Sequence, residues 1–147
     1  MSEDLRSGPE RKADVLAKLS APVADAWVAT GDAYLVPLTL AWFGERIWLA
    51  TSVKSRTARN LSETGRTRIA LGDTRDVVLI DAVLDETIPV AESGAAGEAY
   101  AAQNDWDPRK AGSGFAFFAL RPDQIRAWRN ESEIPGSLIM RDGAWLF

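Results

Sequence analysis

Residues 25–52, DAWVATGDAYLVPLTLAWFGERIWLATS, give the clearest indication of the fold. It holds three runs of β-forming residues, 25–30, 34–43 and 46–52, and each of the two breaks between them contains a glycine. Strand-like runs joined by two or three residues that include a glycine are typical of hairpin turns. The stretch therefore predicts three antiparallel strands that follow one another as a meander.

The middle run, 34–43, is apolar on both of the faces that a strand would present. One face would carry Val36, Leu38, Leu40 and Trp42, and the other Leu35, Ala41 and Phe43. A strand with one solvated face alternates apolar and polar residues, so we expect both faces to be covered, one by the interior of a barrel or sandwich and one by a second subunit. Pro37 has no N–H to donate, which predicts a sheet edge or a break in the ladder at that position.

Shorter elements are predicted on both sides of this meander. Helices are expected at 9–19, 55–64 and within 89–102, further strands at 68–71, 76–84, 115–120 and 124–129, a loop at 104–114, and a final hairpin from 137–140 and 144–147. Ser55 is a good N-cap and Gly65 a good stop for the second helix. Six to eight short strands with two or three small helices predict a mainly β, antiparallel barrel with helices packed at its ends. The length of 147 residues suits a single domain, 1–147, in which we expect residues 1–8 to be flexible.

The chain contains no cysteine and no histidine. These absences exclude disulfides, thiolate metal sites, thiol nucleophiles and a Ser-His-Asp triad built from this chain, and no carboxylate spacing is diagnostic of a metal site. An enzyme of this composition would depend on a bound cofactor, on carboxylates or on a lysine. The net charge of −4 disfavours nucleic acid and anionic membranes as partners. The N-terminus lacks a signal-like apolar core and no apolar stretch reaches about 20 residues, so we expect a cytoplasmic protein without a membrane span.

The segment LATSVKSRTARNL, residues 49–61, carries the pattern most suggestive of ligand binding. At the junction of a predicted strand and a predicted helix it gathers hydroxyl and basic residues: Thr51, Ser52, Lys54, Ser55, Arg56, Thr57 and Arg59. The first amides of a helix lack intrahelical partners and lie at the positive end of its dipole, so a phosphate is well placed there. The sequence therefore predicts an anion site, with a solvated basic helix face as the alternative.

Three further observations extend this prediction. Arg56 and Arg59 are three residues apart, so they share a helix face and could close on one anion. Asn60 could reach the same site or cap a neighbouring strand. Trp128, which is flanked by arginines, could stack on a planar ring, and the alternative is an ordinary packed tryptophan.

In order and spacing, these segments resemble the pyridoxamine 5′-phosphate oxidase-like family of FMN-binding split barrels. The resemblance covers about residues 10–147 and is strongest in the strand with Pro37, in the strand–loop–helix with Ser55, Arg59, Asn60 and Leu61, and in the segment RPDQIRAW, 121–128. It implies an antiparallel split barrel that forms a homodimer, with two cofactor sites at the subunit interface. The implied cofactor is FMN or, as in some members of the family, a deazaflavin coenzyme (F-420).

The resemblance also implies roles for individual residues. Thr51, Ser52 and the segment 54–60 would hold the cofactor phosphate, and Trp128 would come from the partner chain and lie near the flavin. Members often carry lysine where this chain has Thr57, so Lys54, Arg56 or Arg59 would have to supply the positive charge.

The expected function is a flavin- or deazaflavin-dependent oxidoreductase that transfers a hydride on a small molecule, with the loop 104–114 over the substrate. Pyridoxamine phosphate oxidase activity itself is not expected, because relatives with that activity use a histidine on the substrate phosphate and this chain has none. The alternative is a non-catalytic flavin or tetrapyrrole binder that uses the same barrel for storage, transport or sensing.

Overall fold

The computed structural model describes residues 5–147, so the first four of the residues expected to be flexible lie outside the described part. The elements in chain order are α1 (Gly8–Leu19), β1 (Ala24–Thr30), β2 (Tyr34–Phe43), β3 (Arg46–Ser52), α2 (Arg56–Thr64), β4 (Arg66–Leu71), β5 (Val77–Pro89), η1 (Val90–Glu92), α3 (Ala95–Gln103), η2 (Pro108–Lys110), β6 (Phe115–Trp128), η3 (Glu131–Gly136), β7 (Leu138–Arg141) and β8 (Ala144–Trp145). Within these residues no helix is both long and apolar enough to cross a membrane.

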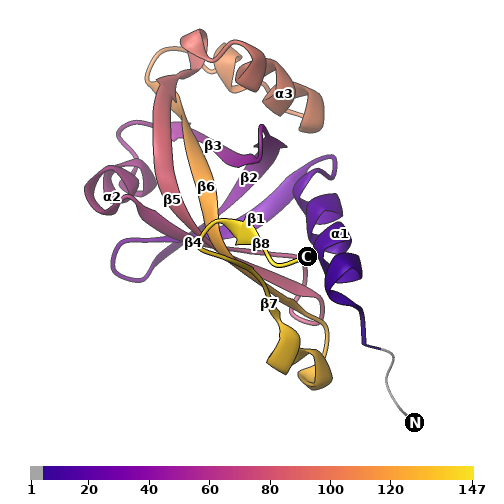
Figure 1. Ribbon diagram of the computed structural model, residues 1–147. Coiled ribbons are helices and arrows are strands. Elements are labelled where there is room, and N and C mark those ends of the chain that lie inside the picture. Colours follow the sequence, from indigo (N-terminus) through magenta and orange to yellow (C-terminus); the bar gives the residue numbers. More distant parts are fainter. Residues whose placement is uncertain (1–4) are drawn as a thin grey trace.

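The strands form one antiparallel sheet that closes on itself (Figure 1). Its order is β3-β2-β1-β4-β5-β6-β7-β8, and an additional pairing of β3 with β6 joins the first six strands into a barrel. The closing ladder runs from Ile47 opposite Leu120 to Ser52 opposite Phe115. The predicted mainly β, antiparallel barrel is therefore confirmed, and β7 and β8 extend the sheet beyond it.

The predicted sheet edge at Pro37 is confirmed by the pairing of β2. Only its last four residues, Leu40–Phe43, pair with β3, whereas the part that contains Pro37 pairs with β1 alone. Pro37 lies opposite Trp27 of β1. The missing N–H of the proline therefore faces the side on which β2 and β3 have separated, where no ladder bond is lost.

The expectation of two separate strands at 115–120 and 124–129 is wrong. The structure has one 14-residue strand, β6, which runs through Pro122 without a break. Its partner β5 places Asp81 opposite Gln124 and Ala82 opposite Pro122, so Asp123 is an extra, bulged residue. A bulge accommodates a proline inside a paired strand, which is why the sequence Arg121-Pro122-Asp123 does not end the strand.

Buried side chains form two clusters, one on each side of the barrel wall. The larger fills the interior and includes Val28, Leu40, Leu49, Ile69, Ile80, Phe118 and Ile125, with Val15 and Leu19 of α1 packed against it. The smaller lies outside β3 and β6, where Trp48 and Phe117 pack beneath Tyr100 of α3. Helix α3 therefore covers an outer face of the barrel, at the top in Figure 1, and not a barrel end as expected.

The outer face beyond α3 stays open. Ala41, near the end of β2, is buried beneath α3, but Leu35 near the start of the same strand is 55% exposed and Trp27 on β1 is 53% exposed. We expected a second subunit to cover the second face of 34–43. Helix α3 of the same chain covers the half of the strand that contains Ala41. The other half presents large apolar side chains to solvent.

Candidate functional site

The loop between β3 and α2 is ordered by its own hydroxyl groups. Ser55 is the N-cap of α2, and its Oγ accepts a hydrogen bond from the Ala58 amide at 3.0 Å. Thr51 Oγ1 donates to Ser55 Oγ at 3.2 Å, and Ser52 Oγ accepts from the Lys54 amide at 3.2 Å. The predicted N-cap is confirmed, as is the stop at Gly65, which ends α2 in the left-handed conformation.

Several donors at this helix start remain available to a ligand. Among residues 5–147, no acceptor pairs with the backbone amides of Arg56 and Thr57, the first two residues of α2. Lys54 and Arg59 are exposed and make no ion pair within the same part of the chain. Two free amides at the positive end of a helix, with two unpaired cations nearby, are suited to an anion.

The structure places Arg56 and Arg59 differently on α2. The Arg56 guanidinium lies over the ring of Tyr34, 4.9 Å from its centroid, at the start of β2. Arg59 points to solvent. Arg56 therefore has a partner that holds it at the base of the open half of β2, and Arg59 does not.

Asn60 takes the second of its two expected roles and caps a neighbouring strand. Its Nδ2 donates to Thr30 Oγ1 at 3.2 Å, which ties α2 to the end of β1. Gly31, which follows Thr30, has a φ of +59°, and a Cβ at this glycine would lie 2.8 Å from the Asn60 side chain. The contact therefore requires glycine in the β1–β2 turn.

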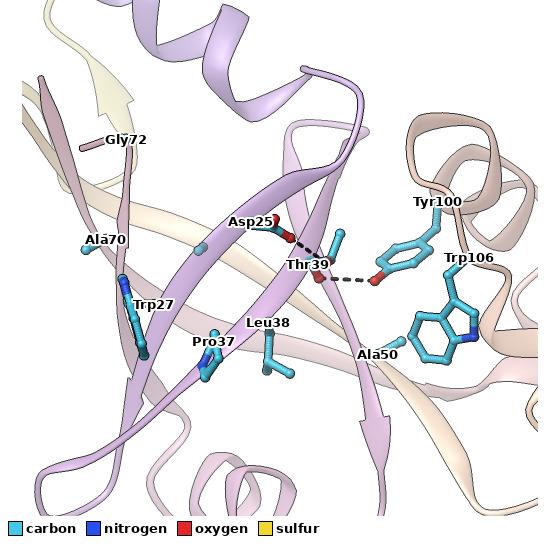
Figure 2. Close-up of a pocket in the computed structure, with 11 residues that line it drawn as sticks. Asp25, Trp27, Pro37, Leu38, Thr39, Ala50, Ala70, Gly72, Tyr100 and Trp106 are labelled. Atoms are coloured by element: carbon cyan, nitrogen blue, oxygen red, sulfur yellow. Dashed lines mark hydrogen bonds between the residues drawn. The ribbon is translucent and has the colours of Figure 1, made fainter.

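A pocket with aromatic walls lies on the outer face of the barrel, between the strands β1 and β2 and the helix α3 (Figure 2). Trp27 and Pro37 stand on one side, and Tyr100 and Trp106 on the other. Ala50 of β3 also lines it, and the cavity volume is about 560 Å³. This volume lies within the range of about 300–1,000 Å³ that is common for small-molecule sites.

Hydrogen bonds fix the polar groups of the pocket. Tyr100 Oη donates to the Thr39 carbonyl at 3.1 Å, and Thr39 Oγ1 donates to Asp25 Oδ1 at 2.8 Å. Burial raises the pKa of Tyr100 to about 12, and the charges of Asp25 and Asp105 add to the effect. The phenol therefore stays protonated and keeps its hydrogen bond at any physiological pH.

The pocket and the polar loop are consecutive along β3. Ala50, which lines the pocket, pairs with Phe117, and Ser52 pairs with Phe115, so both face outward from the barrel. Strand geometry separates two such residues by about 7 Å. The Phe115 ring in turn contacts Trp106, with their centroids 5.9 Å apart. A ligand that spans about two strand residues could therefore reach from the aromatic walls to the start of the loop.

The remaining predicted residue, Trp128, lies far from the loop within one chain. It is the last residue of β6 and pairs with Val77, whereas Ser52 pairs with Phe115, the first residue of the same strand. The whole of β6 thus separates Trp128 from the loop. A role near the loop would require the Trp128 of a second subunit, as the resemblance implies.

A second cavity, of about 950 Å³, lies between α2 and the strands β4, β5 and β6. It is lined by Arg56 and Asn60 together with charged residues of both signs from β4, β5 and β6. One pair among these residues is already closed, because Arg68 Nε donates to Asp81 Oδ1 at 2.6 Å. The described residues that line this cavity include no aromatic side chain, so it is less suited to a planar ligand than the pocket beside β3.

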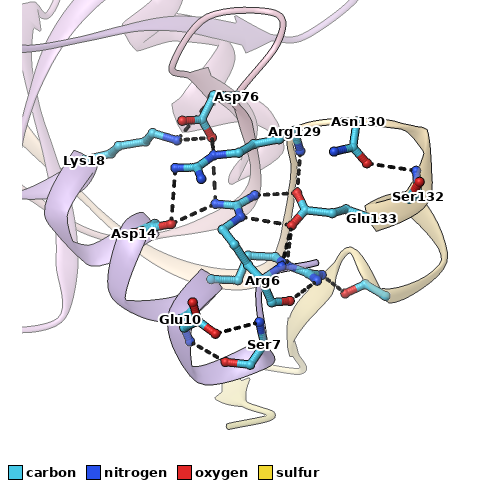
Figure 3. Close-up of polar contacts among 12 residues, drawn as sticks. Arg6, Ser7, Glu10, Asp14, Lys18, Asp76, Arg129, Asn130, Ser132 and Glu133 are labelled. Carbon is cyan, nitrogen blue, oxygen red and sulfur yellow. Dashed lines mark hydrogen bonds and ion pairs between the residues drawn. The ribbon is translucent and has the colours of Figure 1, made fainter. Parts of the chain in front are cut away.

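A polar cluster on the side of the barrel opposite α3 joins the N-terminal segment to η3 (Figure 1 and Figure 3). Arg6, which is 9% exposed, donates to Glu133 at 2.7 Å, and Glu133 is 3% exposed. Arg6 also binds Asp14 at 3.0 Å, and Asp76 binds Lys18 at 2.6 Å. Arg6 thus has fixed partners although it belongs to the segment expected to be flexible. We regard this cluster as structural, because its charges are paired with one another.

Sequence reasoning missed most of the residues that line the aromatic pocket: Asp25, Trp27, Thr39, Tyr100 and Trp106. They lie on β1, on β2, in α3 and in the loop after it, and no local motif links them. The one available signal was the count of six tryptophans in a small chain, from which Trp128 alone was selected. Trp106 does place the loop 104–114 at the pocket, where a substrate cover was expected.

Comparisons with known proteins agree on the fold. No family model and no curated protein matches the sequence. An F420 reductase superposes with a TM-score of 0.60 at 16% identity, over 74% of this chain and 93% of that one. An FAD-binding protein from Mesorhizobium loti gives 0.60 at 16% identity, over 78% and 89%. A heme-binding protein from Mycobacterium smegmatis gives 0.59 at 21% identity, over 88% of this chain and 57% of that one. At such identities, the likeness shows a shared split-barrel fold.

Proposed function

We propose, from the split-barrel fold that this chain shares with flavin- and deazaflavin-binding proteins, that it binds a cofactor of that kind. The cofactor would be FMN or a deazaflavin coenzyme, with its phosphate at the segment 51–60 and its ring in the aromatic pocket. The protein would use it as an oxidoreductase that transfers a hydride on a small molecule. The names of two of the three solved structures mention F420 or FAD, and these two support the proposal at the level of the fold.

The observation that carries the proposal is the continuity of two different environments along β3. Unpaired amides and cations lie at its end, and an aromatic pocket lies beside Ala50. A flavin-type cofactor has the same division, because an anionic phosphate is joined by a chain to a planar ring. The residues therefore fit the cofactor at both ends.

The cofactor would supply hydride acceptance and donation when bound, so the chain itself needs no nucleophile. The Arg56 and Thr57 amides and the Lys54 side chain would bind the phosphate. Tyr100 and Trp106 would orient the ring and exclude water from one of its faces. This division of work agrees with a chain that has neither cysteine nor histidine.

We further propose that the working form is a homodimer. Trp27 and Leu35 are both exposed on the outer face of β1 and of the open half of β2. Large apolar side chains are rarely exposed side by side on the surface of a monomer. Trp27 also borders the pocket, so a second subunit on this face would adjoin the site. Trp128 of that subunit would then be available to the cofactor.

The visible spectrum of the purified protein tests the proposal. Flavin absorption in the isolated protein, or saturable binding of added FMN or of a deazaflavin coenzyme, is expected. Failure to bind any of these cofactors would remove the proposal, because nothing else in the chain supplies redox chemistry. Reduction of the bound cofactor should then be assayed with hydride donors and acceptors.

A second candidate is the non-catalytic binding of a flavin or a tetrapyrrole. The likeness to a heme-binding protein favours keeping it, although this chain offers no histidine or cysteine to a haem iron. The two functions differ in turnover. A binder would hold its ligand without multiple cycles of oxidation and reduction by a second substrate.

A further inference from the structure

The two ends of the candidate site carry opposite charge. The loop end holds Lys54, Arg56 and Arg59. At the aromatic end, the described lining of the pocket contains one charged side chain, Asp25, and no lysine or arginine. A ligand that reaches the pocket therefore meets a carboxylate, whereas a ligand at the loop meets cations.

Asp25 is held in place by its neighbours in the sheet. It accepts the hydrogen bond from Thr39 Oγ1 at 2.8 Å, and the backbone of the same threonine accepts from Tyr100. A second carboxylate, Asp105, adjoins Trp106 in the loop that closes the pocket, and both acids act on the Tyr100 phenol. The charge at this end is thus a fixed property of the pocket walls.

The basic residues in that loop do not offset this charge. Arg109 is bound to Asp107 at 2.9 Å and to Glu98 at 2.7 Å, so its charge is already satisfied. Lys110 is exposed and does not line the pocket. The Asp25 carboxylate is therefore the one charge that the described lining of the pocket presents to a ligand.

The aromatic walls, like the Asp25 carboxylate, favour a cationic ligand over an anionic one. Trp27 is 53% exposed and Trp106 is 42% exposed, so indole surface remains available beside the cavity. The faces of indole rings attract cations and stack on planar rings. The Asp25 carboxylate in the same cavity repels anions.

We propose that the aromatic end of this site accepts a neutral or cationic planar aromatic substrate and discriminates against an anionic one. This inference rests on the proposed function in that both use the same pocket. It goes further because it assigns a chemical class to the molecule that shares the pocket with the cofactor ring. Substrates with a free carboxylate or phosphate at this end should bind more weakly.

Three probes with the same bicyclic shape test the inference by isothermal titration calorimetry of the full chain. They are N-methylquinolinium, quinoline at a pH where it is neutral, and quinoline-3-carboxylate. We expect the cation to bind about tenfold more tightly than the carboxylate, with neutral quinoline between them. Asp25→Asn keeps the shape of the side chain and should reduce this ratio to about threefold or less.

The matched control is Asp32→Asn, which removes an exposed carboxylate in the adjacent β1–β2 turn, outside the pocket. It should leave the cation-to-carboxylate ratio unchanged. Equal binding of the cation and the carboxylate, an unchanged ratio in Asp25→Asn, or no binding of any probe would each overturn the inference.

Titration of FMN and of a deazaflavin coenzyme into the same proteins separates the two proposals. If the cofactors do not bind but the probes show the charge preference, the proposed function fails and the ligand class stands. If a cofactor binds but the probes show no preference, the function stands and the ligand class fails.

Discussion

The guanidinium of Arg56 lies over the aromatic ring of Tyr34, 4.9 Å from the ring centroid. This contact joins the first residue of α2 to the first residue of β2, on the half of the strand that β3 does not cover. It fixes one cation of the predicted phosphate site relative to the barrel. The other two, Lys54 and Arg59, have no ring contact and no ion pair within residues 5–147.

The contact leads to a prediction about phosphate binding. Arg56→Ala should weaken FMN binding about tenfold, or ~1.4 kcal/mol, because it removes a cation that its contact with the Tyr34 ring holds in position. Arg59→Ala, on the same helix, should weaken it less. Calorimetric titration checks both variants, with riboflavin as the ligand that lacks the phosphate and should not respond. A larger loss in Arg59→Ala would place the phosphate on the solvent side of α2.

A second prediction concerns the stability of the fold. Glu133→Gln should lower the free energy of unfolding by about 3 kcal/mol, because it removes the buried carboxylate that pairs with Arg6 and leaves that guanidinium only the more exposed Asp14 and Asp76. The control Glu131→Gln changes an exposed carboxyl group in the same short helix and should have little effect. Urea denaturation measures both. Equal stability of the two variants would show that the ion pair contributes nothing.

The same carboxyl group predicts an acid transition. The hydrogen bond from Arg6 lowers the pKa of Glu133 to about 2, against burial, which acts in the opposite direction. The ordinary value is about 4.3, so in this range the unfolded chain binds a proton more readily than the folded one. The contribution to stability is therefore complete above about pH 4.3 and is lost as the pH falls toward the folded value.

Comparison of the wild type with Glu133→Gln isolates this effect. The difference in their unfolding free energies should be constant near neutral pH and should shrink as the pH falls from about 4.3 to 2. Unfolding curves recorded at a series of pH values provide the measurement. A difference that grew on acidification would contradict the assigned pKa.

A fourth prediction concerns assembly. Leu35→Glu should convert the proposed dimer to monomer, because it places a charge on the exposed apolar face of β2. The side chain is 55% exposed, so the fold of the single chain should survive. Ile134→Glu, at a site that is 47% exposed on η3, is the control. Sedimentation velocity at micromolar concentration measures both, and a monomeric wild type would refute the dimer.

The local elements could be predicted because each has a local cause. The bounds of β2 follow from the glycine turns on either side of it, the start of β3 follows from the turn at Gly44, and the bounds of α2 follow from Ser55 and Gly65. The continuity of β6 could not be predicted, because the bulge that accommodates Pro122 depends on the register with β5. The place of α3 depends on distant partners in the same way, since its Tyr100 packs on Phe117.

The candidate site likewise has one part that depends on local sequence and one part that depends on contacts between distant residues. The loop with Thr51, Ser52 and Ser55 is a short segment, so the Ser55 cap could be predicted from sequence, whereas the hydrogen bonds that Thr51 and Ser52 make within the loop were not. The aromatic pocket brings together Trp27 and Trp106, which are far apart in sequence, and only the closed barrel shows that they share a cavity. Whether the phosphate and the ring occupy these places remains a prediction.

The tryptophans that border the pocket give the molecule a built-in optical reporter. Trp27 and Trp106 are 53% and 42% exposed, whereas Trp48 beneath α3 is 2% exposed. Emission from the first two should respond to acrylamide and to any molecule that enters between them, while that of Trp48 should not. Loading of the cavity can therefore be followed in unlabelled protein, by the fluorescence that solvent can still reach.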